Sequence, residues 1–160
     1  MYGTTRLKGL ISIFIFSVLK PLLKRIKYEF TTNHAQMSTS TLNQLVQGCK
    51  HLKRLIIRKA TIDVTGEVDF GSNLDYQIEY LSFAYSGHPY ISDWKSNPGD
   101  FIKIIKAIKG SGLEKSLKKL NILCCEISLA KAKEMLNSDE IGLNHVQIVK
   151  EDPSPFGFYN

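Results

Sequence analysis

The sequence lacks most of the features that mark secreted proteins and multispan membrane proteins. Its 160 residues include only 3 cysteines, and Cys124 and Cys125 are adjacent, so a disulfide framework of the secreted type is excluded. It contains no Asn-x-Ser/Thr glycosylation sequon. The run from Leu10 to Leu19 covers ten residues, too few to span a bilayer as a helix. We therefore expect an intracellular protein, located in the cytoplasm.

Acidic residues are absent from the first 28 positions. The first one is Glu29, and six cations precede it: Arg6, Lys8, Lys20, Lys24, Arg25 and Lys27. The formal net charge is +6, and from Glu29 onward 15 cations are matched by 15 anions. The body of the chain is therefore neutral, which removes the electrostatic basis for nucleic-acid binding by the folded domain.

Motifs for catalysis and for metal or cofactor binding are also missing. Glu114 occupies the position where a phosphate-binding loop needs glycine, and Gly66 stands at the fourth position of a calcium-loop-like segment, where the sixth is required. Cys49 and His51 are too isolated to form a zinc site. We expect no metal, no cofactor and no enzymatic activity. A nucleophile pair of Cys49 with His145 is the catalytic alternative that the sequence leaves open.

What the chain does contain is a repeated apolar pattern, LxxLxL. It occurs in HLKRLII, IEYLSF, LKKLNI and LNHVQI, at Leu52/Leu55/Ile57, Ile78/Leu81/Phe83, Leu117/Leu120/Ile122 and Leu143/Val146/Ile148. The segments start 26, 39 and 26 residues apart, so the middle interval is one repeat plus an insertion of 13. A single short strand cannot bury its apolar edge alone, so we expect these four strands to stack into one parallel sheet.

Helical periodicity fills most of the intervals, as parallel neighbours require. Apolar stripes predict three helices, formed by Leu42/Leu45/Val46/Cys49, by Phe101/Ile104/Ile105/Ile108, and by Leu129/Ala132/Met135/Leu136 after a capping Ser128. The stretch from Lys59 to Tyr76 alternates instead around Thr65 and Gly66. It predicts extended structure or a small hairpin.

These segments resemble the leucine-rich repeats, in particular the cysteine-containing and ribonuclease-inhibitor-like types. The match is clearest in LVQGCKHLKRLIIRKATI (Leu45 to Ile62) and in SLKKLNILCCEI (Ser116 to Ile127), where Cys125 takes the place of the family's Asn or Cys. The equivalent positions hold Ala60 and Ser86, which departs from the family. The resemblance implies an α/β solenoid with a concave parallel sheet, helices on the convex side, and binding of protein partners.

Within that interpretation, residues between the apolar positions face outward on the concave side. The column Arg54, Tyr80, Lys119, His145 is basic with one aromatic ring, and Lys118 and Asn121 accompany it. We expect a protein partner with an acidic surface to bind there. The alternative is a solvated face that binds nothing strongly.

The insertion after the second segment gives a second candidate surface. It gathers Tyr90 and Trp94 with two other aromatic or imidazole side chains in a loop containing glycine and proline, as functional loops often do. The opposing interpretation is that the single tryptophan covers the edge of its own core.

The chain divides into a basic lead (1–39), a repeat domain (40–151) and a C-terminal tail or cap (152–160). Residues 10–28 form an amphipathic pattern suited to membrane-surface contact or mitochondrial targeting, unless they belong to an extra repeat. The leading hypothesis is a scaffold that binds protein without catalysis. Alternatives are a membrane-attached or mitochondrial structural subunit of a larger complex, and a substrate-binding adaptor for ubiquitin ligation.

Overall fold

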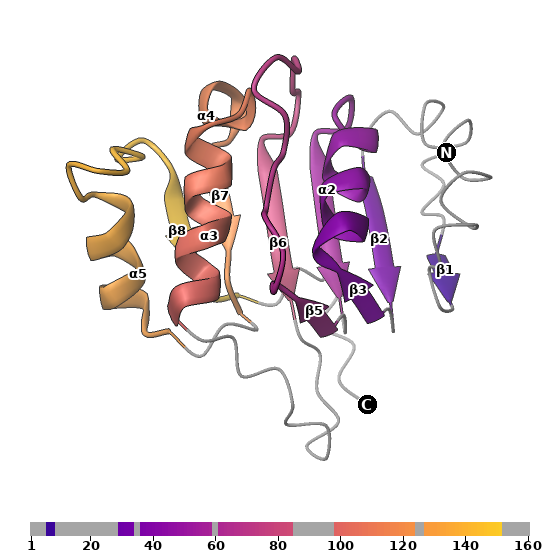
Figure 1. The fold of residues 1–160 in the computed structure, drawn as a ribbon, viewed down its shortest axis with the longest axis horizontal. Coiled ribbons are helices and arrows are strands. Elements are labelled where there is room, and N and C mark those ends of the chain that lie inside the picture. The colour runs from indigo at the N-terminus through magenta and orange to yellow at the C-terminus, as the bar shows by residue number, and fades with distance from the viewer. Residues whose placement is uncertain are drawn as a thin grey trace.

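The computed structural model describes residues 6–8, 29–33, 36–58, 61–84, 98–123 and 127–151 (Figure 1). These residues form an α/β structure built on parallel strands. The strands are β1 (Arg6–Lys8), β2 (Glu29–Asn33), β3 (Gln36–Ser38), β4 (Arg54–Arg58), β5 (Thr61–Asp63), β6 (Tyr80–Ala84), β7 (Lys119–Asn121) and β8 (Gln147–Val149). The helices are α2 (Thr39–Gly48), α3 (Pro98–Lys109), α4 (Leu113–Ser116) and α5 (Leu129–Leu136).

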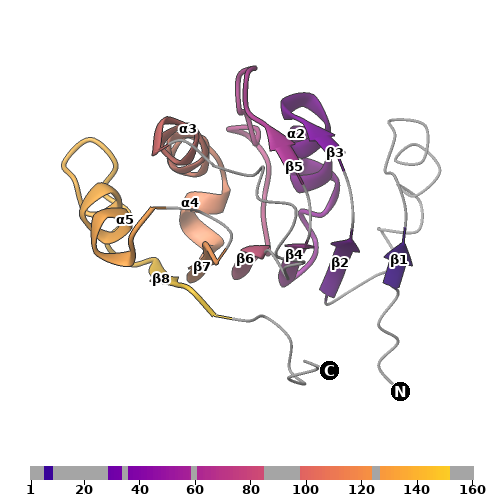
Figure 2. The same ribbon diagram turned by 90° about the horizontal axis from the view of Figure 1, so that it is seen from below.

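Six of the strands form one sheet in the order β1-β2-β4-β6-β7-β8, and every neighbouring pair is parallel. A second, two-stranded sheet pairs β3 with β5, also in parallel. Seen along the sheet in Figure 2, the helices lie together on one side of the six strands. The other side of the sheet carries no helix among the described residues, and we call it the open face.

The apolar pattern LxxLxL determines this arrangement. All twelve apolar positions of the four segments are buried, the most exposed being Val146 at 7%. The three predicted helices are confirmed as α2, α3 and α5, and their apolar stripes pack on the same core. Ser128 caps α5 as predicted, because its side chain accepts a hydrogen bond from Lys131 N at 3.1 Å.

Strand register follows the sequence pattern in three of the four segments. Leu55 in β4 lies beside Leu81 in β6, which lies beside Leu120 in β7. In β8, however, Ile148 takes the place beside Leu120, where the pattern predicts Val146. The fourth segment is therefore shifted by two residues, which keeps each side chain on its expected side because strand side chains alternate with period two.

A turn accounts for this shift. Val146 N donates to the carbonyl oxygen of Leu143 at 3.0 Å, which holds Val146 in a tight turn before β8 begins at Gln147. The prediction that His145 joins the column of Arg54, Tyr80 and Lys119 is consequently wrong. Gln147 is the β8 residue paired with Lys119.

Of the two forms predicted for the stretch from Lys59 to Tyr76, the hairpin around Thr65 and Gly66 is wrong, whereas extended structure is present at β5. Residues 64–79 contain neither strand nor helix, and β5 pairs in parallel with β3. Side chains of α2 bind the backbone of this stretch instead: Gly66 N donates to Thr39 Oγ1 at 3.1 Å, and the Asn43 side chain donates to Glu67 O at 3.0 Å. These bonds satisfy polar groups that a hairpin partner would otherwise satisfy.

The expected lead takes part in the sheet, since β1 and β2 lie within residues 1–39 and extend the order of strands beyond β4. The expected amphipathic segment 10–28 lies outside the described residues, and so do Cys124, Cys125 and the tail 152–160. No helix in the described ranges combines the length and the apolar character needed to cross a membrane.

Gly112 marks a close approach between the turn before α4 and the stretch 64–79. A methyl group added at Gly112 would overlap the carbonyl oxygen of Leu74 and press on the ring of Tyr76. We therefore expect Gly112→Ala to lower the free energy of unfolding by about 1–3 kcal/mol, measured by urea denaturation. The matched control is Gly110→Ala, whose added carbon meets only Lys106 O at 3.5 Å, an ordinary contact. Equal stability of the two variants would contradict the packing described here.

Candidate interaction surface on the open face

Two rows of side chains cross the open face, because alternate residues of each strand point to this side of the sheet. The first row contains Arg54, Tyr80 and Lys119, which pair across β4, β6 and β7. The second row, two residues further along each strand, contains Ile56, Ser82 and Asn121.

Tyr80 is the centre of the first row. The Arg54 guanidinium carbon lies 4.5 Å from the centre of its ring, and Lys119 Nζ lies 5.9 Å from it. Both distances fall within the range of cation–π attraction. Tyr80 is only 7% exposed, so its ring supports the two cations and contributes little surface of its own.

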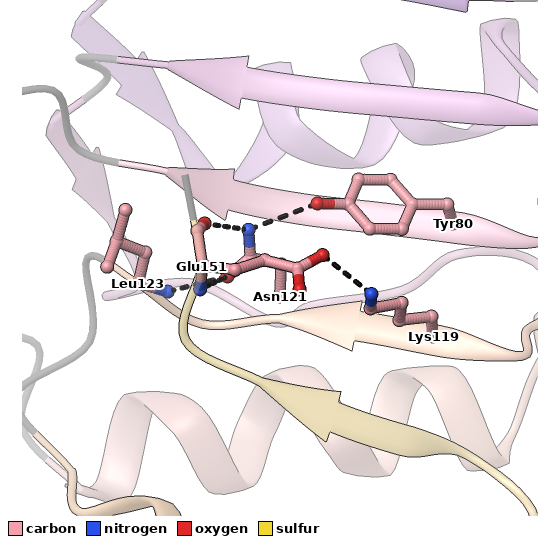
Figure 3. A network of polar contacts seen from close by, with 5 residues as sticks. All are labelled: Tyr80, Lys119, Asn121, Leu123 and Glu151. Atoms are coloured by element: carbon pink, nitrogen blue, oxygen red, sulfur yellow. Dashed lines mark hydrogen bonds and ion pairs between the residues drawn. The ribbon is translucent and has the colours of Figure 1, made fainter. Parts of the chain in front are cut away.

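Asn121 joins the two rows and is completely buried. Its Nδ2 donates to Tyr80 Oη at 3.1 Å and to the backbone oxygen of Glu151 at 2.6 Å. Its Oδ1 accepts from the backbone nitrogens of Leu123 at 3.1 Å and of Glu151 at 3.3 Å (Figure 3). Both donors and both acceptor positions of the amide are thus in use. Asn121 is therefore a structural link, which corrects the prediction that its side chain is exposed for partner binding.

Ion pairs surround this network. Lys119 Nζ lies 2.6 Å from Glu151 Oε1 (Figure 3), and Glu79 lies between Lys118 at 3.1 Å and Lys53 at 3.9 Å. The Lys118 side chain is the most exposed of these, at 73%. Arg54 and the three lysines thus lie near three acidic residues, Glu79, Glu151 and Glu29, the last being the β2 residue paired with Arg54. Four cations against three acidic residues leave an excess of one positive charge.

The charges perturb one carboxyl group. The hydrogen bond from Lys118 and the charges of Lys118 and Lys53 hold the pKa of Glu79 below its usual value. The Glu79 side chain is 41% exposed, so solvent screens the interaction and its contribution to stability is small. The ion pairs place Lys53 and Lys118 next to the same carboxylate.

The structure thus brings together five of the eight sequence-predicted residues: Arg54, Tyr80, Lys118, Lys119 and Asn121. His145 lies apart from them, with its Nε2 2.8 Å from the backbone oxygen of Glu114. The other two, Tyr90 and Trp94, lie outside the described residues.

Comparison with protein-family models, with curated proteins and with solved structures found no match for this chain. The candidate interaction surface is therefore described only from the positions and contacts of its residues.

Glu151 is the participant that sequence reasoning missed. It lies after the last LxxLxL segment, where the repeat pattern no longer specifies a position. Its backbone is bound by Asn121 and its carboxylate by Lys119, so it closes the network from outside the repeat. The sequence carries no signal for this role, because the burial of Asn121, which makes its polar atoms need partners, is known only from the structure.

The described residues offer no comparable arrangement for chemistry. They contain no group of three or more His, Cys, Asp or Glu side chains placed to hold a metal ion. Burial raises the pKa of the Cys49 thiol to about 12, so the thiol remains protonated near neutral pH. Because the thiolate is the nucleophilic form, this environment is unsuitable for the Cys49 and His145 pair left open by the sequence.

A hollow on the helix side lies between α3 and α5. Its lining includes Ile102, Met135 and Ile141, and an ion pair joins Lys106 Nζ to Glu140 Oε1 at 2.6 Å. The mixed lining contrasts with the open face, where the cations are in excess.

Replacing Asn121 tests the network. Asn121→Ala removes four hydrogen bonds and leaves the Glu151 and Tyr80 partners without them, so we expect the free energy of unfolding to fall by about 2–3 kcal/mol. Asn144→Ala, at an exposed position, should change it by less than about 0.5 kcal/mol. Urea denaturation of both variants measures the difference, and comparable losses would show that Asn121 has no special role.

The Glu79 pKa gives a second test. Lys118→Met removes the hydrogen bond and the main charge that lower it, so the Glu79 pKa should rise in an NMR titration of the side-chain carboxyl. Because a lowered carboxyl pKa stabilises the folded state above the unfolded-state pKa, this small contribution is lost as the pH falls through the folded-state pKa. Lys131→Met, which removes the partner of Glu134, should leave the Glu79 titration unchanged.

Proposed function

We propose that this chain is a non-enzymatic protein-binding module of the leucine-rich repeat type, and that it binds its partner with the open face of the sheet. The observation that carries the proposal is the first row of that face. Arg54 and Lys119 flank the ring of Tyr80 on a side of the sheet without helices among the described residues. Lys53 and Lys118, the residues immediately before β4 and β7, are exposed and pair with Glu79.

Support for the repeat type comes from the strand register. Segments starting at Leu52, Ile78 and Leu117 align residue by residue across β4, β6 and β7, as repeats of one structural unit would. The two-residue shift of β8 and the stretch 64–79, which holds no helix, depart from a regular solenoid. Terminal and interrupted repeats tolerate such departures.

The charge of the surface indicates the chemistry of the partner. Four cations and three acidic residues, Glu29 included, leave an excess of one positive charge, so an acidic surface would be attracted to it. Such a partner can replace Glu79 as the acceptor for Lys53 and Lys118, since those ion pairs are exposed and weak. Peripheral charges of this kind act mainly on the association rate and on specificity.

The second candidate is a membrane-attached or mitochondrial subunit whose repeats support a larger complex. It is favoured by one observation, the concentration of the whole charge excess in the acid-free first 28 residues. In that case residues 1–39 determine where in the cell the protein is located, and the open face still binds another protein of the complex. The cytoplasm remains the proposed location under the first candidate.

Charge reversal on the open face tests the binding proposal. The intact chain, its Lys53→Glu/Lys118→Glu variant and its Lys131→Glu/Lys133→Glu variant are each used to capture proteins from cell extract. The second variant reverses two exposed cations on α5, on the helix side, and keeps the same net charge and the same lead as the first. Captured proteins are identified by mass spectrometry, and their affinities are then measured by calorimetry with purified components.

We expect at least one protein that is retained by the wild type and by the α5 variant and lost by the open-face variant. Its Kd should increase about tenfold, equivalent to ~1.4 kcal/mol, on reversal of Lys53 and Lys118. Increased salt should weaken the wild-type complex. Identical capture by the two variants would contradict binding through the open face.

A further inference from the structure

Three charged residues stand immediately before neighbouring strands of the sheet. Lys53 precedes β4, Glu79 precedes β6 and Lys118 precedes β7, and we call these three residues the entry row. The carbonyl oxygen of Lys53 accepts hydrogen bonds from the backbone nitrogens of Glu79 at 2.9 Å and Tyr80 at 3.1 Å. In the same way, the carbonyl oxygen of Glu79 accepts from the backbone nitrogens of Lys118 at 2.9 Å and Lys119 at 3.0 Å. The repeated pattern shows that the entry row occupies equivalent positions on the three strands.

This backbone pattern determines the spacing of the entry row. Neighbouring strands are about 5 Å apart, so the backbones of Lys53 and Lys118 are about 10 Å apart, with Glu79 between them. The Glu79 carboxylate uses one oxygen for each lysine. Its Oε1 lies 3.9 Å from Lys53 Nζ, and its Oε2 accepts a hydrogen bond from Lys118 Nζ at 3.1 Å. A single carboxylate therefore occupies the acceptor position between two cations whose spacing the backbone determines.

The entry row is also open to exchange, because all three side chains are exposed to solvent. An exposed ion pair contributes about 0–1 kcal/mol, so a carboxylate from another molecule can displace Glu79 at little cost. The hydrogen bond from Lys118 and the charges of both lysines hold the pKa of Glu79 below its usual value. Glu79 is consequently charged near neutral pH and competes with any carboxylate that approaches the same two lysines.

We propose that Glu79 is an internal competitor of the partner: it occupies the acceptor position between Lys53 and Lys118, and a carboxylate of an acidic protein segment takes this position on binding. The inference rests on the proposed function, since the two lysines belong to the surface assigned there. It has a consequence that an ordinary surface ion pair lacks. Removing Glu79 should strengthen binding, because the partner no longer has to displace it. Glu79 thereby restricts binding to segments that place a carboxylate between the lysines.

A defined acidic peptide tests the competition. Hexaglutamate is titrated into the 15N-labelled intact chain at fixed pH and ionic strength, and its Kd is measured from the backbone amide shifts of Lys53 and Lys118 in NMR spectra. We expect Glu79→Gln, which preserves the shape of the side chain, to lower this Kd about two- to fivefold, the range expected from the loss of weak exposed ion pairs.

The matched control is Glu134→Gln on α5. It also removes an exposed carboxylate paired with a lysine, Lys131 at 2.7 Å, and it raises the net charge by the same amount. At physiological ionic strength its distant charge is screened, so the Kd measured at Lys53 and Lys118 should stay the same.

A second background separates competition from a general effect of charge. In the Lys53→Met/Lys118→Met chain, Glu79 no longer occupies a position between two cations. This chain should bind hexaglutamate less tightly than the wild type, and the further change Glu79→Gln should restore none of the loss. A gain from Glu79→Gln that persists in this background would contradict competition for the two lysines.

The remaining outcomes also decide the proposal. An equal or higher Kd for Glu79→Gln, the same gain for Glu134→Gln, or no peptide-induced shift at the entry row in any chain would overturn it. Failure of the proposed function is recognised separately, by capture from cell extract. A partner that is lost on reversal of Lys53 and Lys118, but binds Glu79→Gln with unchanged affinity, would refute the competition and keep the proposed function. Capture of no such partner would refute the proposed function whatever the peptide titration shows.

Discussion

The structure depends on the parallel stacking of strands too short to be stable alone. The strands β4 and β6 have five residues each, and β7 and β8 have three. None can bury its apolar side chains without its neighbours, because each contributes only part of a common core. The apolar positions of successive segments must therefore lie side by side, and the paired leucines Leu55, Leu81 and Leu120 satisfy this requirement. The helices complete the same core from one side, and the other side of the sheet carries mainly polar and charged residues, with Ile56 and the Tyr80 ring among them.

That open face has two rows with different physical roles. In the first, cations stand beside an aromatic ring and remain partly in contact with solvent, so their energetic cost of desolvation is low. In the second, Asn121 is buried and its amide must find a partner for every polar atom. It does so by binding backbone groups that lie beyond its own strand, at Leu123 and Glu151. The rows meet at the Tyr80 hydroxyl, which accepts from Asn121 while the Tyr80 ring contacts Arg54.

The sequence predicts the parts of this structure that depend on local periodicity. The helices α2, α3 and α5 follow from apolar stripes, and the four core segments follow from a spacing that repeats. Two features depend instead on contacts between distant residues. The shift of β8 results from the turn between Leu143 and Val146, which competes with strand pairing. The irregular stretch 64–79 results from hydrogen bonds with α2 side chains such as Asn43, which replace the pairing that a hairpin would give. No pattern of apolar residues contains either kind of information.

The sequence likewise predicts only those features of the candidate surface that follow from the alternation of residues along each strand. Alternation along the strands places Arg54, Tyr80 and Lys119 on one side, and the register confirms that they are neighbours. Exposure was not predictable, because it depends on what lies over the sheet. Because Asn121 occupies an outward strand position, its side chain was expected to be exposed. In the structure the side chain is buried, and every polar atom of its amide is hydrogen-bonded. The distinction matters for binding, since a buried asparagine determines the shape of the surface, whereas Lys118 and Lys53 determine its charge. A partner that recognises this face would accordingly depend on the lysines for attraction and on the Asn121 network for the shape of the surface around Tyr80 and Glu151.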